Sequence, residues 1–257
     1  MKHIAIIGGL ILSLLSPPVI AEETLIDLRS KEYFTGQKKI SIKQLIETLN
    51  GFVEPISKSS IVRADYEQLR IANGLSEMEM TYLDYVKVRM IFESTRDGGF
   101  WNIKWDITDE EPSSKRIWQL LSQVKVGETN ITAVAECDEI SAFFAFLVYR
   151  MGVKNVGLFW PTYNHTVAVW SVGEKRIVVP NSQIFLTDEA TLGTNEFDPW
   201  TQKKIYEYRK QDVPSNFKIP QHLGNFMIKR LLKDIDKPAT TLQQLRNAHV
   251  DQYGGSQ

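Results

Sequence analysis

Hydrophobic side chains recur at helical spacing through residues 24–95, and polar side chains fill the positions between them. Four apolar residues between Ile42 and Leu49 fall on one face of a helix. Ser41 stands just before this run and Gln44 follows three positions after the serine, which is the pattern of a capping box. These features predict a helix that begins at residue 42.

Two further helices are predicted in the same segment. Residues 64–72 form a short helical pattern that ends at Asn73-Gly74. Ser76 and Glu79 make a second capping box, which we interpret as the start of a helix that runs to Phe92. The first third of the chain is therefore predicted to be a helical extension.

The middle of the chain mixes helix and strand patterns. Residues 115–124 read as a helix capped by Ser114, and an apolar helix is predicted from 137 to 151, closed by Gly152. Strand patterns follow, with a hairpin at Gly173-Glu174 between the last two. The predicted strands are 155–160, 165–172 and 176–179.

The first residues have the pattern of a targeting segment. Lys2 precedes an apolar run over 4–15, and the small or β-branched residues up to Ala21 suit a signal peptidase. The run is short for a membrane span, so we predict cleavage after Ala21 and a periplasmic or secreted protein, with an uncleaved anchor as the alternative. No cysteine follows the run, which excludes a lipoprotein anchor.

Four parts are predicted along the chain. They are a signal peptide at 1–21, an N-terminal helical extension at 22–95, a core at 96–200 and a C-terminal helical tail at 201–257. The chain holds 30 Lys and Arg against 31 Asp and Glu, and this balance gives no support for nucleic-acid binding. After signal cleavage no remaining stretch is apolar enough to span a bilayer.

The chain has one cysteine, Cys137, at the start of the apolar helix. It cannot form an internal disulfide, so it is a buried inert thiol, an intermolecular partner or a reactive group. Free N–H groups at a helix start stabilise a thiolate and an oxyanion. His165 follows 28 positions later at the start of a strand pattern, and Asn181 follows the next hairpin. Together they would form a thiol-nucleophile site in which the third group orients the imidazole.

Each residue also has a plainer interpretation. A single cysteine is often a small buried core residue. His165 alone would be a polar residue at a strand edge, and Asn181 after Pro180 would be a turn residue. The functional reading depends on all three positions occurring together in this order.

The stretch from Cys137 to Val153, CDEISAFFAFLVYRMGV, resembles the nucleophile helix of the transglutaminase-like superfamily. The stretch from His165 to Trp170 resembles the histidine strand of that family. The resemblance covers about residues 115–190. It implies an α+β fold with a papain-like core, in which the nucleophile helix packs on an antiparallel sheet.

The resemblance also implies a Cys-His-Asp triad that transfers an acyl group from an amide through a thioester. Cys137 would be the nucleophile and His165 the general base and acid. This chain has Asn181 after a proline where the family usually has Asp before proline, so Asn181 is the expected third member and Asp188 competes for the role. The resulting function is an exported cysteine peptidase or amidase acting on a protein or peptide amide in the cell envelope. The alternatives are a cross-linking acyltransferase and a non-catalytic binding module.

Aromatic residues near the predicted site are candidates for substrate binding. Trp101, in a segment rich in glycine and tryptophan, and Trp160, at the end of a strand pattern, would line the substrate cleft. Docking of the helical extension is the alternative use of Trp101. No cofactor is expected, although Asp138 and Glu139 could touch calcium, as in some exported relatives in the family, with solvation on a helix surface as the alternative. The oligomeric state stays open.

Overall fold

The computed structural model describes residues 24–96, 102–104, 113–123, 132–134, 137–162, 165–179, 206–207 and 213–237. The predicted signal peptide at 1–21 lies outside these residues. The described chain combines helices with small sheets, which confirms the α+β class. None of the described helices is both long and apolar enough to cross a membrane.

Helices dominate the N-terminal part, as the apolar spacing predicts. The elements are α1 (Leu25–Ser30), β1 (Lys39–Ser41), α2 (Ile42–Gly51), α3 (Val53–Ser57), α4 (Ser60–Ala72) and α5 (Tyr82–Thr95). The capping box before α2 is confirmed, because the Ser41 hydroxyl accepts from the Gln44 N–H at 3.2 Å and the Gln44 side chain accepts from the Ser41 N–H at 2.9 Å.

The second capping box does not start a helix. The Ser76 and Glu79 side chains make the expected reciprocal bonds, but they close a turn, and α5 begins only at Tyr82 after a second cap at Thr81. The prediction of one continuous helix from Ser76 was therefore wrong at its start. From Tyr85 on, α5 is buried on nearly every side, because α3, α4, α7 and α8 all pack against it.

The remaining elements follow the predicted order with short additions. They are β2 (Asn102–Lys104), α6 (Lys115–Leu121), β3 (Thr132–Val134), α7 (Cys137–Arg150), β4 (Val156–Thr162), β5 (His165–Val172), β6 (Lys175–Val179), β7 (Tyr206–Glu207), β8 (Lys218–Pro220) and α8 (Gln221–Asp234). Ser114 is the residue before α6 but makes no capping hydrogen bond through its side chain, so that part of the prediction was wrong. Instead, the Ser113 hydroxyl accepts from the N–H of Lys115 at 3.1 Å.

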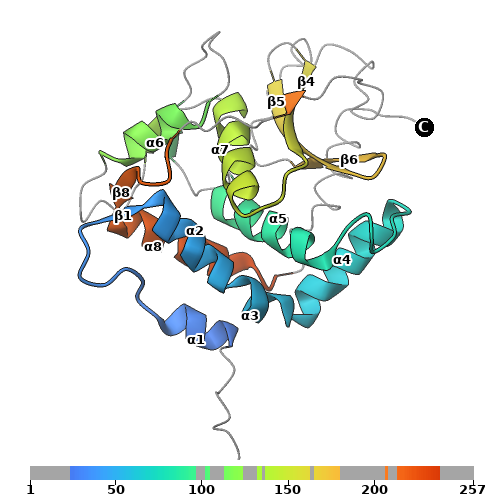
Figure 1. Cartoon of the computed structure of the whole chain (residues 1–257), viewed down its shortest axis with the longest axis horizontal. Helices are drawn as coiled ribbons and strands as arrows, with labels where there is room; N and C mark the ends of the chain where they lie inside the picture. Colours follow the sequence, from blue (N-terminus) through green and yellow to red (C-terminus); the bar gives the residue numbers. More distant parts are fainter. Residues whose placement is uncertain are drawn as a thin grey trace, which may run out of the picture.

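An antiparallel sheet with the strand order β6-β5-β4-β7 packs on α7. In Figure 1, α7 stands beside this sheet and above α5, and it packs against both. Strand β5 alternates, so that Ala168 and Trp170 join the core around α7 while Val167 and Val169 belong to a second buried cluster. The hairpin predicted at Gly173-Glu174 is confirmed, and Gly173 adopts the left-handed φ of 55° that its turn requires.

The C-terminal elements return to the N-terminal helices. Strand β8 pairs with β1 in antiparallel register, and α8 packs on α1 and α5 (Figure 1). The buried core is continuous from the N-terminal helices through α7 and the sheet to α8. The site helix α7 is thus held in a single core to which both ends of the described chain contribute.

Buried charges reinforce the contact between α4, α5 and α8. Arg89 on α5 is fully buried, and its guanidinium binds Asp65 on α4 at 2.7 Å and Glu93 at 2.9 Å. Arg96 then joins Glu93 at 2.7 Å to Asp234 at 3.2 Å on α8. Charges withdrawn from water this far require partners with good geometry, and here each carboxylate has at least one.

Candidate functional site

Cys137 is the first residue of α7 and its side chain is partly exposed. Eleven consecutive residues after it, from Asp138 to Val148, are buried. This stretch of the helix is buried because α5, α6 and the sheet all pack against it. This packing fixes the position of the thiol at the start of a rigid helix, at the positive end of the helix dipole.

The structure brings the start of β5 against the cysteine. The N–H of Thr166 donates a hydrogen bond to Cys137 Sγ with an N···S distance of 3.2 Å. This N–H belongs to the peptide group that joins His165 to Thr166. The backbone of His165 therefore lies one peptide away from the thiol, even though 27 residues separate the two in the chain.

The β4–β5 hairpin sets the position of His165. His165 opens β5 and pairs with Thr162 of β4, and the register shifts between Phe159 and Thr162. Such irregularities re-aim a strand end, and they are common beside functional sites. The His165 side chain is outside the described part of the structure, so the described contact is made by its backbone.

The other predicted site residues fall mostly outside the described residues. Asn181, Asp188 and Trp101 all lie in such segments. Trp160 falls within β4, with its side chain outside the described part. Strand β6 ends at Val179, which pairs with Ala168 of β5, three residues from His165. The chain consequently leaves the sheet near the end of β5 that contacts Cys137.

The two acidic residues after the cysteine are buried, which overturns their interpretation as solvated surface charges. Asp138 and Glu139 are 7% and 6% exposed. An Asp138 carboxylate oxygen accepts from the N–H of Glu139 at 2.8 Å, and Glu139 binds Arg116 of α6 at 3.5 Å. Arg116 thus supplies a compensating positive charge at the first turn of α7. In the described part of the chain, no group of three metal-binding side chains gathers.

Two residues at this site were missed by sequence reasoning. Ser141 lies one turn after Cys137 on α7 and its hydroxyl donates to the Thr166 carbonyl at 3.3 Å. Both Ser141 and Thr166 are buried, at 0% and 2% exposure. The available signal was weak, namely one hydroxyl inside each of two otherwise apolar runs.

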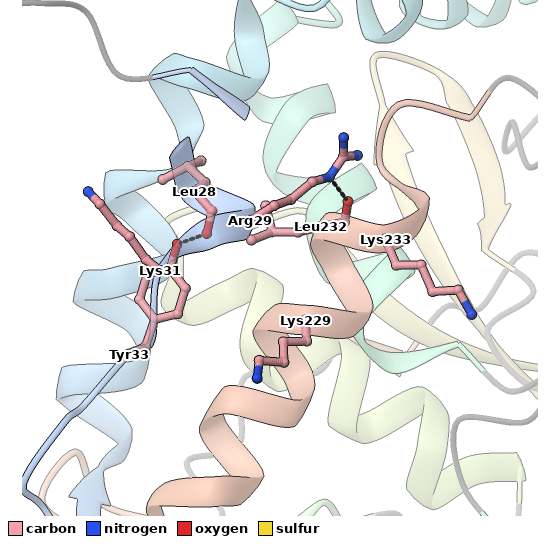
Figure 2. Close-up of a pocket in the computed structure, with 7 residues that line it drawn as sticks. All are labelled: Leu28, Arg29, Lys31, Tyr33, Lys229, Leu232 and Lys233. Carbon is pink, nitrogen blue, oxygen red and sulfur yellow. Dashed lines mark hydrogen bonds between the residues drawn. The ribbon is translucent and has the colours of Figure 1, made fainter. Parts of the chain in front are cut away.

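A separate shallow pocket lies between α1, the segment after it and α8. Figure 2 shows its lining residues, which include four cations: Leu28, Arg29, Lys31, Tyr33, Lys229, Leu232 and Lys233. Arg29 donates to the Leu232 carbonyl at 2.8 Å, and the hydroxyl of Tyr33 donates to the Leu28 carbonyl at 2.6 Å. Burial raises the pKa of Tyr33 to about 12, so the phenol keeps its donor proton.

Two of the four cations around this pocket bind carboxylates nearby. Arg29 binds Asp236 at 2.7 Å and Lys229 binds Glu32 at 2.9 Å. In Figure 1, α2 and α5 lie between α1 and α7, so the pocket is remote from the cysteine. The pocket therefore contributes nothing to the chemistry at Cys137.

No protein-family model, curated protein or solved structure matches this chain. The functional argument consequently depends on the geometry at Cys137. A thiol at a helix N-terminus, in contact with a histidine-bearing strand, is suited to nucleophilic attack on a carbonyl carbon.

Proposed function

We propose that this protein is an exported cysteine peptidase or amidase of transglutaminase-like type, acting on a protein or peptide amide in the cell envelope. One observation carries the proposal: the peptide group that joins His165 to Thr166 donates its N–H to Cys137 Sγ at 3.2 Å. Nucleophile and base must lie within hydrogen-bond reach of each other, and a contact between their backbone neighbourhoods is the first requirement for this.

The architecture around the cysteine supports a papain-like core. The cysteine-bearing helix α7 packs on an antiparallel sheet whose adjacent strands β5 and β6 follow it in the chain. Three electrostatic features favour the thiolate of Cys137. They are the start of α7, the Thr166 N–H, and Arg116, which offsets the charge of Glu139.

In the proposed reaction the Cys137 thiolate attacks the carbonyl carbon of the substrate amide. A carbon–sulfur bond forms and the carbonyl electron pair moves onto oxygen. The carbon–nitrogen bond then breaks, and the departing amine takes a proton from the His165 imidazolium, leaving a thioester. His165 next accepts a proton from water, the oxygen of which attacks the thioester carbon. The carbon–sulfur bond breaks, the acid product leaves and the thiolate returns.

Asn181 is proposed as the residue that orients the imidazole. It follows the end of β6 by two residues, and β6 ends beside the portion of β5 near His165. The side-chain carbonyl of asparagine can accept from an imidazole N–H, so an aspartate is not required. Asp188 is nine residues beyond the end of β6, so the shorter distance along the chain favours Asn181.

The test is the pH dependence of iodoacetamide alkylation at Cys137, followed by mass spectrometry. Because the chain has one cysteine, the reaction reports on a single site. We expect a thiol pKa well below the free value of about 8.5, and we expect His165→Ala to raise it. His222→Ala, which removes a histidine from α8, is the matched control and should leave the profile unchanged.

Two outcomes distinguish the proposal from its rivals. A slow reaction with an ordinary thiol pKa, indifferent to His165→Ala, would mean a structural cysteine and a non-catalytic protein. If the thiol is reactive, Cys137→Ala should abolish hydrolysis of peptide amides while leaving the thermal midpoint nearly unchanged. Retained turnover in that variant would refute the assignment of Cys137 as nucleophile.

A further inference from the structure

The backbone of Thr166 is held by α7 at two points. Its N–H donates to Cys137 Sγ at 3.2 Å and its C=O accepts from the Ser141 hydroxyl at 3.3 Å. Cys137 and Ser141 are four positions apart, so they lie one above the other on the same helix face. One residue of the strand therefore bridges one turn of the helix.

Among the described strands, no register pair includes Thr166. The register of β5 with β4 passes from Val167 to His165, and the register of β5 with β6 begins at Ala168. The N–H and C=O of a residue in a strand point to the same side, which allows both groups of Thr166 to reach α7. Both backbone polar groups of Thr166 thus bond to side chains of α7.

A serine at position 141 is energetically unfavourable unless its hydroxyl has a hydrogen-bond partner. Its side chain is fully buried among apolar neighbours from Ile140 to Leu147. A buried hydroxyl loses its water partners, and serine has a lower helix propensity than alanine. Alanine would satisfy the packing here, so the hydroxyl is explained by the bond that it makes to β5.

We infer that Ser141 is a positioning residue for the Cys137–His165 pair. Its hydroxyl holds the first residues of β5 against the first turn of α7, which aims the Thr166 N–H at the sulfur and fixes the backbone of His165. This inference rests on the proposed function, because positioning matters only if the thiol reacts. A hydrogen bond to the charged sulfur stabilises the thiolate, and small displacements of reacting groups lower rates steeply.

The test compares alkylation profiles of Cys137 between pH 4 and 9 in the full chain. We expect Ser141→Ala to lower the iodoacetamide rate at pH 6 about 3- to 10-fold by raising the thiol pKa. Ser141→Thr keeps the hydroxyl and should stay within about 2-fold of the wild type. The matched control is Ser94→Ala on α5, which removes a buried hydroxyl that donates to the Ile91 carbonyl at 3.1 Å within its own helix.

The outcomes separate this inference from the proposed function. An unchanged profile in Ser141→Ala, with a raised pKa in His165→Ala, would overturn the role of Ser141 and leave the catalytic pair standing. Equal changes in Ser141→Ala and Ser94→Ala would also overturn it, since they would report general loosening. Indifference to both Ser141→Ala and His165→Ala would refute the proposed function itself.

Discussion

Replacing Arg89 with methionine is the sharpest test of how the scaffold is held together. Arg89 is fully buried, and it is the one ion-pair partner that Asp65 has within the described residues. Methionine keeps similar bulk and helix propensity, so the substitution removes mainly the charge and its hydrogen bonds. Glu93 retains Arg96 at 2.7 Å, which leaves Asp65 as the unpaired charge.

The expected loss follows from the burial of that carboxylate. Removing one partner of a buried ion pair costs about 3–5 kcal/mol, because the remaining charge is neither hydrated nor paired. For a chain of this size each kcal/mol lowers the thermal midpoint by about 2–4 °C. We therefore expect Arg89→Met to lower the midpoint by about 6–20 °C.

Urea unfolding at pH 7, followed by circular dichroism, measures the loss of unfolding free energy, and thermal unfolding measures the fall in midpoint. Arg63→Met on α4 is the control, because about half of the Arg63 side chain is exposed. Its ion pair with Glu67 at 3.9 Å and its cation–π contact with the Tyr82 ring at 3.7 Å each contribute at most about 1 kcal/mol at such a site. Asp65→Asn in the Arg89→Met background should recover much of the loss. Equal, small effects of Arg89→Met and Arg63→Met would refute the reasoning.

The pH dependence of the same variant provides a second check. Burial raises the pKa of Asp65 above its ordinary value of 3.8, an effect that Arg89 offsets only in part. The native state therefore binds a proton at Asp65 more readily than the unfolded state does. Lowering the pH toward 4 should relieve part of the destabilisation in Arg89→Met, since protonation removes the unpaired charge.

Two further predictions concern α8. Burial alone would raise the pKa of Asp234, but Lys237, Arg230 and Arg96 more than offset this effect and hold the pKa below 3.8. The ionised Asp234 therefore stabilises the fold above that pH, and this stabilisation is lost as the pH falls. Asp234→Asn should therefore cost about 2–3 kcal/mol at pH 7 in urea unfolding, and the difference from wild type should shrink below about pH 4; a difference constant with pH would contradict this. Gly224→Ala should destabilise by about 1 kcal/mol or more despite the better helix propensity of alanine, because a Cβ there would lie 2.5 Å from Ile40 Cδ1 in a filled core. Gly51→Ala is the control, because a Cβ there meets nothing within 4 Å, and it should be neutral or stabilising. Identical shifts of the urea midpoint in Gly224→Ala and Gly51→Ala would refute the packing argument.

Local signals in the sequence were sufficient to predict the helices α2, α4, α5, α6 and α7 and the strands β4, β5 and β6. The capping box at Ser41 predicts the start of α2, and the apolar run after Cys137 predicts α7, because each depends on residues within a few positions of one another. Where a local signal has two uses, prediction was less exact. The Ser76–Glu79 box stabilises a turn as well as it stabilises a helix start, and the chain uses it for the turn.

Contacts between distant segments could not be read from the chain. The pairing of β1 with β8 joins residues about 180 positions apart, and it makes a strand of three residues within a segment whose apolar spacing predicts helix. The burial of Asp138 and Glu139 is similar. The sequence shows two acids at a helix start, and only the approach of α6 with Arg116 makes their burial tolerable.

The sequence by itself determined the secondary structure around Cys137 and His165, because helix and strand periodicities are local properties of the chain. Only the tertiary structure decided that the peptide after His165 touches the sulfur and that Ser141 holds the same residue from the next turn of α7. The physical reason is that such contacts depend on how β5 packs on α7, and that packing is set by the whole core at once rather than by any short run of residues.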